Sequence, residues 1–285
     1  MSRLLIINAD DFGSSEAINA AVAQAHRFGT LTSASLMVTG NAVREAVSIA
    51  RDLPDLAVGL HLALSNAKSI LPQEVIPDLV NAESRFSDDP IACAWHYYFS
   101  RRAKAQLAAE IEAQFEAFAQ TGLHLSHVDG HQHLHAHPFV MPVVMKMANR
   151  YDAKGIRAPR DPFFTNLGVD RTHIGSKIVT ALGHGYLSTV YRRALRGSGL
   201  ATCNLSIGAM MSGAMNVDYV TLMLEKIHAR SVEVFFHPSI SDCVRQGPNT
   251  GDLQTLLNPE FREFVKSAGF TLSTYADISK PEARK

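Results

Sequence analysis

Two adjacent carboxylates near the start of the chain are the first residues whose types and spacing suggest chemistry. Asp10 and Asp11 come directly after the apolar run at residues 4–9. Carboxylates are rarely buried without a partner, because removing them from water is costly. At the carboxyl end of a buried strand they usually bind a metal ion or transfer a proton. The alternative is a turn in which an aspartate caps the next helix.

Histidine is the second candidate type, with 13 copies in 285 residues. His61 interrupts the apolar run at residues 56–64, and five histidines lie within residues 127–137. A core histidine and a surface histidine run are the alternatives, but Asp-Gly-His directly after a predicted strand fits a surface run poorly. One carboxylate and two imidazoles can hold a divalent ion, Zn²⁺ or Mg²⁺, and leave coordination positions for water and substrate.

A third candidate lies near the end of the chain. Residues 232–236 read as a buried strand that ends at His237, and Pro238 halts the strand and fixes its exit direction. Histidine titrates near neutral pH and can therefore act as a general acid. The case for His237 rests on the strand-end position that it shares with the other candidates.

These candidates follow the strands of an alternating strand–helix chain. Strands are predicted at residues 4–9, 33–38, 56–64, 124–129, 155–158 and 232–236, and helices at 16–28, 41–51, 103–119 and 139–151. Apolar strands that alternate with helices predict a parallel sheet with right-handed crossovers. No glycine fingerprint follows the first strand, which disfavours a Rossmann nucleotide site. We therefore predict an α/β fold, a distorted (β/α) TIM-like barrel, with its chemistry at the carboxyl ends of the strands.

The chain is long enough for one such barrel, and we predict a single domain over residues 1–285. Two segments break the rhythm and are predicted insertions at the carboxyl-end face, at residues 66–102 and 161–215. The first begins with a turn-rich stretch that we interpret as an active-site loop. Within the second, residues 174–196 are apolar but basic, which fits a lid, a peripheral contact with an anionic membrane or a plain surface helix.

Charge and cysteine content narrow the function classes. The 27 basic and 27 acidic side chains balance, which disfavours a general nucleic-acid binder. Three widely spaced cysteines without a CxxC pair indicate reduced thiols. No segment approaches the roughly 18–20 apolar residues that span a bilayer. We expect a cytoplasmic protein without a transmembrane segment, and residues 174–196 are its candidate contact with the inner face of the membrane.

Four sequence blocks resemble those of the YdjC-type carbohydrate deacetylases, which include chitooligosaccharide deacetylases. They are Asn-Ala-Asp-Asp-Phe-Gly at 8–13, Gly-Leu-His at 59–61, His-Val-Asp-Gly-His-Gln-His-Leu-His at 127–135 and Phe-His-Pro at 236–238. The stretch at 269–275 also looks like the family's closing strand. The resemblance implies a distorted (β/α) barrel that hydrolyses the N-acetyl group of an N-acetylated sugar with a divalent metal ion.

Carried over by motif position, the resemblance also implies roles for individual residues. One divalent metal ion, Zn²⁺ or Mg²⁺, would be bound by Asp11, His61 and His131. Asp10, next to the metal ligand, would be the general base that takes a proton from water. His237 would be the acid that donates a proton to the departing nitrogen.

Further polar residues are candidates around this group. Asp129 would steady a metal ligand from behind. His133 and His135 follow a strand-like period of two and would either fix a ligand or contact the sugar, with backbone-bonded loop histidines as the alternative. Arg157 and Arg160 would grip sugar hydroxyls or a phosphate, and structural ion pairs are the alternative for both.

The sequence leaves several substrates and two other functions open. Gly130 occupies a position where chitooligosaccharide deacetylases often have serine, whereas residues 157–160 and 212–215 look more like the branch associated with hopanoid biosynthesis. That branch is thought to deacetylate an N-acetylglucosaminyl hopanoid lipid, so a glycolipid is a candidate substrate beside chitooligosaccharides. The rivals are a metal-dependent phosphoesterase, which would often hold two or more metal ions, and a metal- or sugar-binding protein without turnover.

Overall fold

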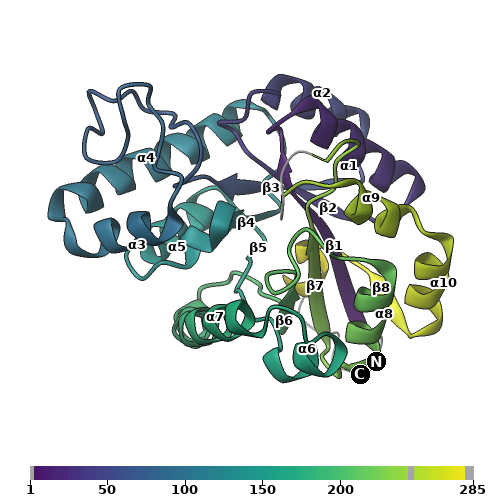
Figure 1. Ribbon diagram of the computed structural model, residues 1–285. Helices are drawn as coiled ribbons and strands as arrows, with labels where there is room; N and C mark the ends of the chain where they lie inside the picture. The colour runs from purple at the N-terminus through teal and green to yellow at the C-terminus, as the bar shows by residue number, and fades with distance from the viewer. Residues whose placement is uncertain (1–2, 243–246, 280–285) are drawn as a thin grey trace.

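The computed structural model describes residues 3–242 and 247–279, which form a curled parallel sheet flanked by helices (Figure 1). The sheet has eight strands, and every pair of neighbours in it is parallel. In chain order the strands are β1 (Arg3–Phe12), β2 (Ser33–Leu36), β3 (Ala57–Leu62), β4 (His127–Gly130), β5 (Gly155–Ile156), β6 (Leu205–Ile207), β7 (Ser231–Phe236) and β8 (Phe270–Leu272).

Helices lie on both sides of the strands and below them in the view of Figure 1. They are α1 (Glu16–Phe28), α2 (Val43–Asp52), α3 (Pro90–Phe99), α4 (Arg101–Gln120), the 3₁₀ helix η1 (His131–Ala136), α5 (Met141–Arg150), α6 (Phe163–Val169), α7 (Ile174–Leu195), α8 (Val217–Lys226), α9 (Thr250–Leu257), α10 (Pro259–Ser267) and α11 (Tyr275–Ser279). Capping explains several starts: the Ser15 side chain accepts the N–H of Ile18 at the start of α1, and Asp89 caps α3 ahead of Pro90.

The curled sheet nearly closes on itself. Its order is β5-β4-β3-β2-β1-β7-β6, and β8 pairs with the first residues of β1. Hydrogen bonds then join the two edges: the N–H of Ile156 donates to the carbonyl of Ala201, and the N–H of Ser206 donates to the carbonyl of Arg160. The result confirms the predicted distorted (β/α) barrel. Apolar side chains fill the space between the strands and the helices.

The two predicted insertions fold differently from each other. The chain after β3 is irregular up to residue 89 and then forms α3, a helix that the sequence analysis does not anticipate. The segment after β5 forms α6 and α7, but its strand β6 belongs to the sheet itself. Within the described residues, no helix is both long and apolar enough to cross a membrane.

The cysteines take no part in a disulfide within the described residues. Cys93 and Cys203 are buried free thiols. Burial raises the pKa of both thiols, which disfavours the thiolate form. Cys243 lies outside the described residues.

Candidate active site

A bulge in β1 places Asp10 and Asp11 at the carboxyl end of the sheet. The sequence predicts that the strand ends at residue 9, but β1 continues through both carboxylates to Phe12. Its register against β2 shifts between Ala9 and Phe12, and Asp11 has a left-handed backbone with φ of 63°. In a regular strand adjacent side chains point to opposite faces, so this irregularity changes where each carboxylate points.

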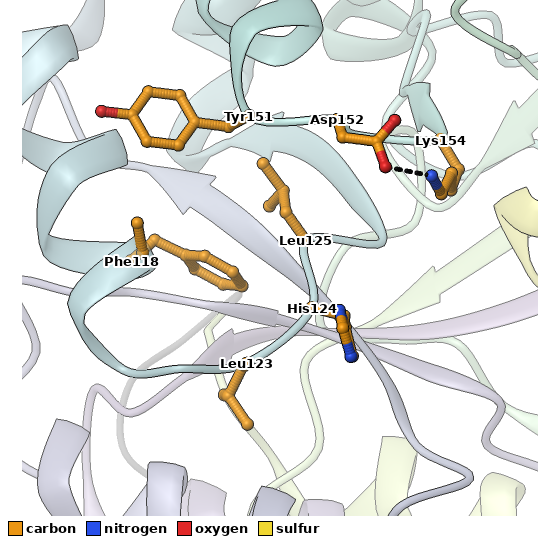
Figure 2. A pocket seen from close by; sticks show the side chains of 8 residues that line it. Phe118, Leu123, His124, Leu125, Tyr151, Asp152 and Lys154 are labelled. Carbon is orange, nitrogen blue, oxygen red and sulfur yellow. Dashed lines mark hydrogen bonds and ion pairs between the residues drawn. The ribbon is translucent and has the colours of Figure 1, made fainter.

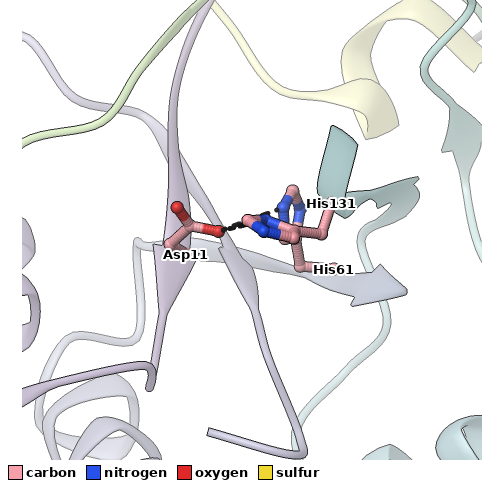
Figure 3. A group of neighbouring side chains, drawn as sticks. All are labelled: Asp11, His61 and His131. Carbon is pink, nitrogen blue, oxygen red and sulfur yellow. Dashed lines mark hydrogen bonds and ion pairs between the residues drawn. The ribbon is translucent and has the colours of Figure 1, made fainter. Parts of the chain in front are cut away.

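Asp11 meets two imidazoles from neighbouring parts of the sheet (Figure 3). His61 lies near the end of β3, and His131 is the first residue after β4. The Oδ1 atom of Asp11 is 3.3 Å from Nε2 of His61 and 2.9 Å from Nδ1 of His131. The structure therefore brings together the three residues that the sequence analysis assigns to a metal ion, and their ligand atoms lie within 4.8 Å of one another.

The donor set fits a small divalent cation. Two ligand atoms about 2.1 Å from one tetrahedral ion lie roughly 3.4 Å apart, close to the distances between the Asp11 oxygen and the two imidazole nitrogens. The second nitrogen of His61, Nδ1, lies 2.8 Å from Oδ1 of Asp129. A carboxylate in this position orients the imidazole and leaves Nε2 for a metal ion. Three protein ligands leave coordination positions for water and substrate.

Electrostatics at this cluster favour positive charge. Burial raises the pKa of Asp11, but His131 and His61 outweigh it and hold the pKa well below its usual range. Burial lowers the pKa of His61, but Asp129 and Asp11 outweigh that effect and raise it to about 10. In the protein alone, a proton on His61 meets this demand, and a bound cation would compete for the same position.

Asp10 is clamped by Arg157, the residue that follows β5. Both carboxylate oxygens of Asp10 accept hydrogen bonds from the guanidinium, at 2.7 and 2.8 Å, and Asn8 donates a third at 2.8 Å. The clamp is planar and bidentate, so it fixes the orientation of the carboxylate. Arg157 is fully buried, and burial lowers its pKa while Asp10, Asp129 and Glu233 together raise it well above the usual value.

Arg157 serves as the hub of a larger carboxylate cluster. Its Nη2 atom also lies 2.7 Å from Asp129, and its Nε donates to Glu233 of β7 at 3.1 Å. Together with the neighbouring Asp11, the cluster holds four carboxyl groups and this single guanidinium. Burial raises the pKa of Glu233, although Arg157 opposes the effect. The excess of negative charge is a further feature that suits a bound divalent cation.

His237 approaches Asp10 from the end of β7. Its Nε2 lies 4.0 Å from Oδ2 of Asp10, and its side chain keeps 16% of its surface exposed. On the other side of the ring, Nδ1 lies 3.5 Å from the hydroxyl of Ser212. The backbone N–H of His237 donates to Asp252 at 2.8 Å, which anchors the residue. The predicted acid therefore lies beside the predicted base and remains partly exposed.

Four residues predicted to bind substrate occupy other surroundings. Arg157 makes buried ion pairs, which is the alternative role that the sequence analysis gives for it. The Nε2 atom of His135 is 3.0 Å from the carbonyl oxygen of Arg157, so this buried imidazole is bonded to the backbone. His133 packs edge-to-face on Phe235. The strand-like period predicted for these histidines is wrong, because η1 is a 3₁₀ helix in which His133 has a left-handed backbone.

Arg160 lies away from the proposed metal ligands. It is exposed and lines a cavity of about 480 Å³ together with residues from the start of β6 and the segment before β7, among them Lys226, His228 and Arg230. Arg160 follows β5, but most of its neighbours in this cavity lie at the start of β6 or before β7, whereas Asp11 and the imidazoles lie at the opposite ends of the strands. A role for Arg160 in gripping the sugar is therefore not supported by its position.

A second cavity lies at the same far end of the barrel. It measures about 300 Å³ and is lined by the segments that precede β4 and β5, with Phe118, Leu125 and Tyr151 among its walls (Figure 2). Asp152 and Lys154 form an ion pair at its edge. No proposed metal ligand reaches this cavity, so we assign it no part in the chemistry.

The sequence analysis misses several residues of the buried network. Glu233 interrupts an apolar strand just as His61 does, and that pattern is the signal that could have revealed it. Ser35 donates to Asp129 at 2.7 Å, and Tyr275 donates to Glu233 at 2.9 Å. His127 stacks on Tyr275, and burial lowers its pKa to about 4, although Asp129 opposes this. Hydroxyl groups such as these carry no signal of their own in the sequence.

The site combines a carboxylate and two imidazoles with a second, clamped carboxylate and a partly exposed histidine. This arrangement is typical of metal-dependent hydrolases. Comparison with known families identifies the family of the chain. Residues 4–267 match the family of YdjC-like proteins, and the chain belongs to this family.

Curated relatives carry the name carbohydrate deacetylase. One from Brevibacillus brevis is 38% identical over 283 residues, which span 96% of this chain and 99% of that protein. Another, from Geobacillus stearothermophilus, is 37% identical over 158 residues, which span 53% of this chain and 58% of that protein.

Solved structures share the fold. A "putative cellobiose-phosphate cleavage protein" from Enterococcus faecalis has a TM-score of 0.75 at 23% identity, and the match covers 98% of this chain and 100% of that chain. The lactam utilization protein from Thermus thermophilus has a TM-score of 0.50 at 14% identity and covers 94% of this chain and 98% of that chain. At these identities, the likeness extends to the fold alone.

Proposed function

We propose that this protein is a carbohydrate deacetylase that removes the N-acetyl group from an N-acetylglucosamine-containing substrate with one divalent metal ion. The observation that carries the proposal is the convergence of Asp11, His61 and His131 on one point beside Asp10. Full-length relatedness to a carbohydrate deacetylase supports the reaction class.

The roles proposed for the residues follow from their positions. Asp11, His61 and His131 would hold the ion. When bound, such an ion lowers the pKa of a coordinated water and polarises the acetamide oxygen. Asp10, adjacent in sequence to a ligand and oriented by Arg157, accepts the proton of the attacking water. His237 donates a proton to the departing amine, and its side chain is partly exposed beside Asp10.

We further propose a glycolipid, an N-acetylglucosaminyl hopanoid, as the substrate in the cell. Helix α7 supports a lipid-associated role: residues 171–196 contain no acidic side chain, and Ile178, Val179 and Leu182 are exposed. A helix with exposed apolar residues and basic flanks suits the surface of an anionic membrane. Through this helix, the protein would contact the inner face of a membrane at its periphery.

Acetate release tests the proposal directly. The substrates are short chitooligosaccharides and a lipid that carries N-acetylglucosamine, each measured with added divalent metal and again with chelator. We expect chelator-sensitive release, and preference for the lipid would support the hopanoid proposal over a chitooligosaccharide substrate. Metal content of the purified protein is measured in parallel. Two or more ions per chain with phosphatase activity and no acetate release would favour the phosphoesterase alternative.

A further inference from the structure

Helix α3 is fixed over the carboxyl-end face of the barrel by its inner side. The hydroxyl of Tyr97 donates to the carbonyl of Leu64, two residues after β3, at 2.7 Å. The Nε2 atom of His137, at the end of η1, lies 3.1 Å from the carbonyl of Ala94. These bonds hold α3 against the two segments that carry His61 and His131, so the helix borders the proposed active site.

The outer side of α3 is apolar and largely exposed. Four of its side chains form this surface, which we call the α3 face, with exposed fractions of 65% for Ile91, 62% for Trp95, 45% for Tyr98 and 70% for Phe99. Ile91, Trp95 and Phe99 follow the helical spacing i, i+4 and i+8, so they lie on one side of the helix. Phe139, which is 41% exposed, extends the surface, and its ring contacts Tyr98.

The rings of the α3 face are arranged against one another. Trp95 and Phe99 stack with their planes 4° apart and their centroids 5.6 Å apart. Monomeric proteins rarely leave such large apolar side chains grouped in water, so the group marks a surface that another molecule covers. The exposed Phe28, by contrast, is the only exposed large apolar side chain on α1 among the described residues.

Positive charge lies directly beside these rings. Arg101 and Arg102 follow the helix and are exposed, and Nζ of Lys104 sits 3.6 Å from the ring centre of Phe139. Asp88 and Asp89 lie at the opposite end, where Asp89 is occupied as the helix cap. An apolar surface with basic residues at one end matches an anionic bilayer, in which aromatic rings enter the interface and cations meet the headgroups.

We propose that the α3 face binds the surface of an anionic lipid bilayer, with its basic end toward the headgroups. Both α3 and α7 contact η1, so the two exposed helices border the same active-site segment. This contact would bring the active site close to a lipid-linked sugar. This part of the inference rests on the proposed function.

The single tryptophan of the chain reports on this surface directly. The full-length protein is mixed with vesicles of phosphatidylcholine and phosphatidylglycerol, and with vesicles of phosphatidylcholine alone, without substrate. We expect a blue shift of Trp95 emission with anionic vesicles at low salt, quenching by brominated lipid, and loss of both in high salt. Binding without any change in Trp95 emission would overturn the proposal, because another surface would then carry the contact.

Variants measured by vesicle co-sedimentation complete the test. Ile91→Ser with Phe99→Ser should abolish most binding, while the matched control Phe28→Ser should leave it unchanged. Arg101→Gln with Arg102→Gln should weaken binding roughly 25-fold, since each basic residue near the surface contributes about a fivefold effect. A blue shift with soluble chitooligosaccharide but none with vesicles would overturn the bilayer in favour of a sugar. Acetate release from a soluble substrate is unaffected by these outcomes, so the proposed function fails or succeeds separately.

Discussion

Asp10 and Asp11 are neighbours in sequence but have separate partners in the structure. Asp11 faces two imidazoles and Asp10 faces a guanidinium, and the bulge in β1 is what separates them. A carboxylate among imidazoles is suited to a cation, whereas a carboxylate held by a bidentate arginine is suited to a fixed position beside it. This division is the physical basis for assigning one residue to binding and the other to proton transfer.

Substituting the two kinds of residue should separate metal binding from turnover. Asp10→Asn should keep the metal ion but lose roughly 10²- to 10⁴-fold in kcat, the usual contribution of a proton-transfer group. His131→Ala should lose both the ion and the activity. Metal content by elemental analysis and acetate release are measured on the same preparations. Equal metal loss in the two variants would contradict the division of roles.

The role of His237 can be tested by changing the leaving group. His237→Ala should slow amide hydrolysis by roughly 10²- to 10⁴-fold, because an amine must be protonated as it departs. An activated phenyl acetate has a leaving group that departs without a proton, so the same variant should hydrolyse it at nearly the wild-type rate. Rates on both substrates decide the matter. An equal loss on amide and ester would indicate that His237 acts in some other way.

At the scale of residues, the sequence predicts the reactive side chains better than the side chains that hold them in position. His61 stands out because it interrupts an apolar strand, and Asp11 because it follows one. Arg157 does not stand out, because the sequence alone does not distinguish a buried arginine from an exposed one. Only the structure shows the three carboxylates around it. The position of Arg160 depends on how β5 and β6 meet, which is a long-range feature that no local pattern reveals.

At the scale of elements, the junction between β4 and η1 is tightly packed. A Cβ atom added to Gly130 would lie 3.0 Å from the side chain of His135 and 3.0 Å from the carbonyl oxygen of Leu62. Gly130→Ser should therefore destabilise the fold by about 1–3 kcal/mol, the usual cost of overpacking. Adding His135→Ala should recover part of the loss. Denaturant unfolding measures both, and a Gly130→Ser variant as stable as the wild type would contradict the packing argument.

The segment that precedes Ser212 is held by the carboxyl group of Asp161, whose charged form is destabilised by burial. Asp161 accepts the N–H groups of Gly208 and Met210, at 3.2 and 3.1 Å, and burial raises its pKa to about 6. Because the unfolded value is near 3.9, the folded state binds the proton more tightly. This group's contribution to stability is therefore greatest below about pH 4 and decreases until about pH 6.

Asp161→Asn should remove that pH dependence while keeping an acceptor oxygen. The variant should be more stable than the wild type above pH 6, by about 1–3 kcal/mol. The difference should shrink toward pH 4, where the wild-type carboxyl is protonated. Unfolding curves collected from pH 4 to pH 8 provide the comparison. A constant difference across that range would show that ionisation of Asp161 is not its cause.

The sequence predicts some regular elements of this chain and misses others, among them α3, β6 and α8 to α10. Helix α1 has the predicted bounds, because Ser15 caps its start and Gly29 follows its end. Helix α7 lies within one residue of its predicted bounds, although no side chain caps its start. Helix α3 is missed since its apolar side faces outward, so it lacks the amphipathic pattern of a packed helix. The turn at η1 is missed because left-handed backbone at Gln132 and His133 has no reliable sequence signal.

At the scale of the whole molecule, the barrel encloses more negative than positive charge at its functional end. Asp10, Asp11, Asp129 and Glu233 lie in one cluster with Arg157, and all five side chains are buried. Buried charges that lack full compensation destabilise a fold. A bound divalent cation would therefore act on the stability of the entire protein as well as on its chemistry.

Divalent metal should accordingly raise the unfolding temperature of the protein, and chelator should reverse the rise. At a free metal concentration 100 times the dissociation constant, binding to the folded state alone adds about 2.7 kcal/mol to the free energy of unfolding. His131→Ala should abolish the rise, while the matched control His124→Ala, an exposed histidine at the far end of the barrel, should retain it. Differential scanning calorimetry at several metal concentrations gives the measurement. If the wild type and His131→Ala respond alike, the ion binds elsewhere, and Asp11, His61 and His131 are not its ligands.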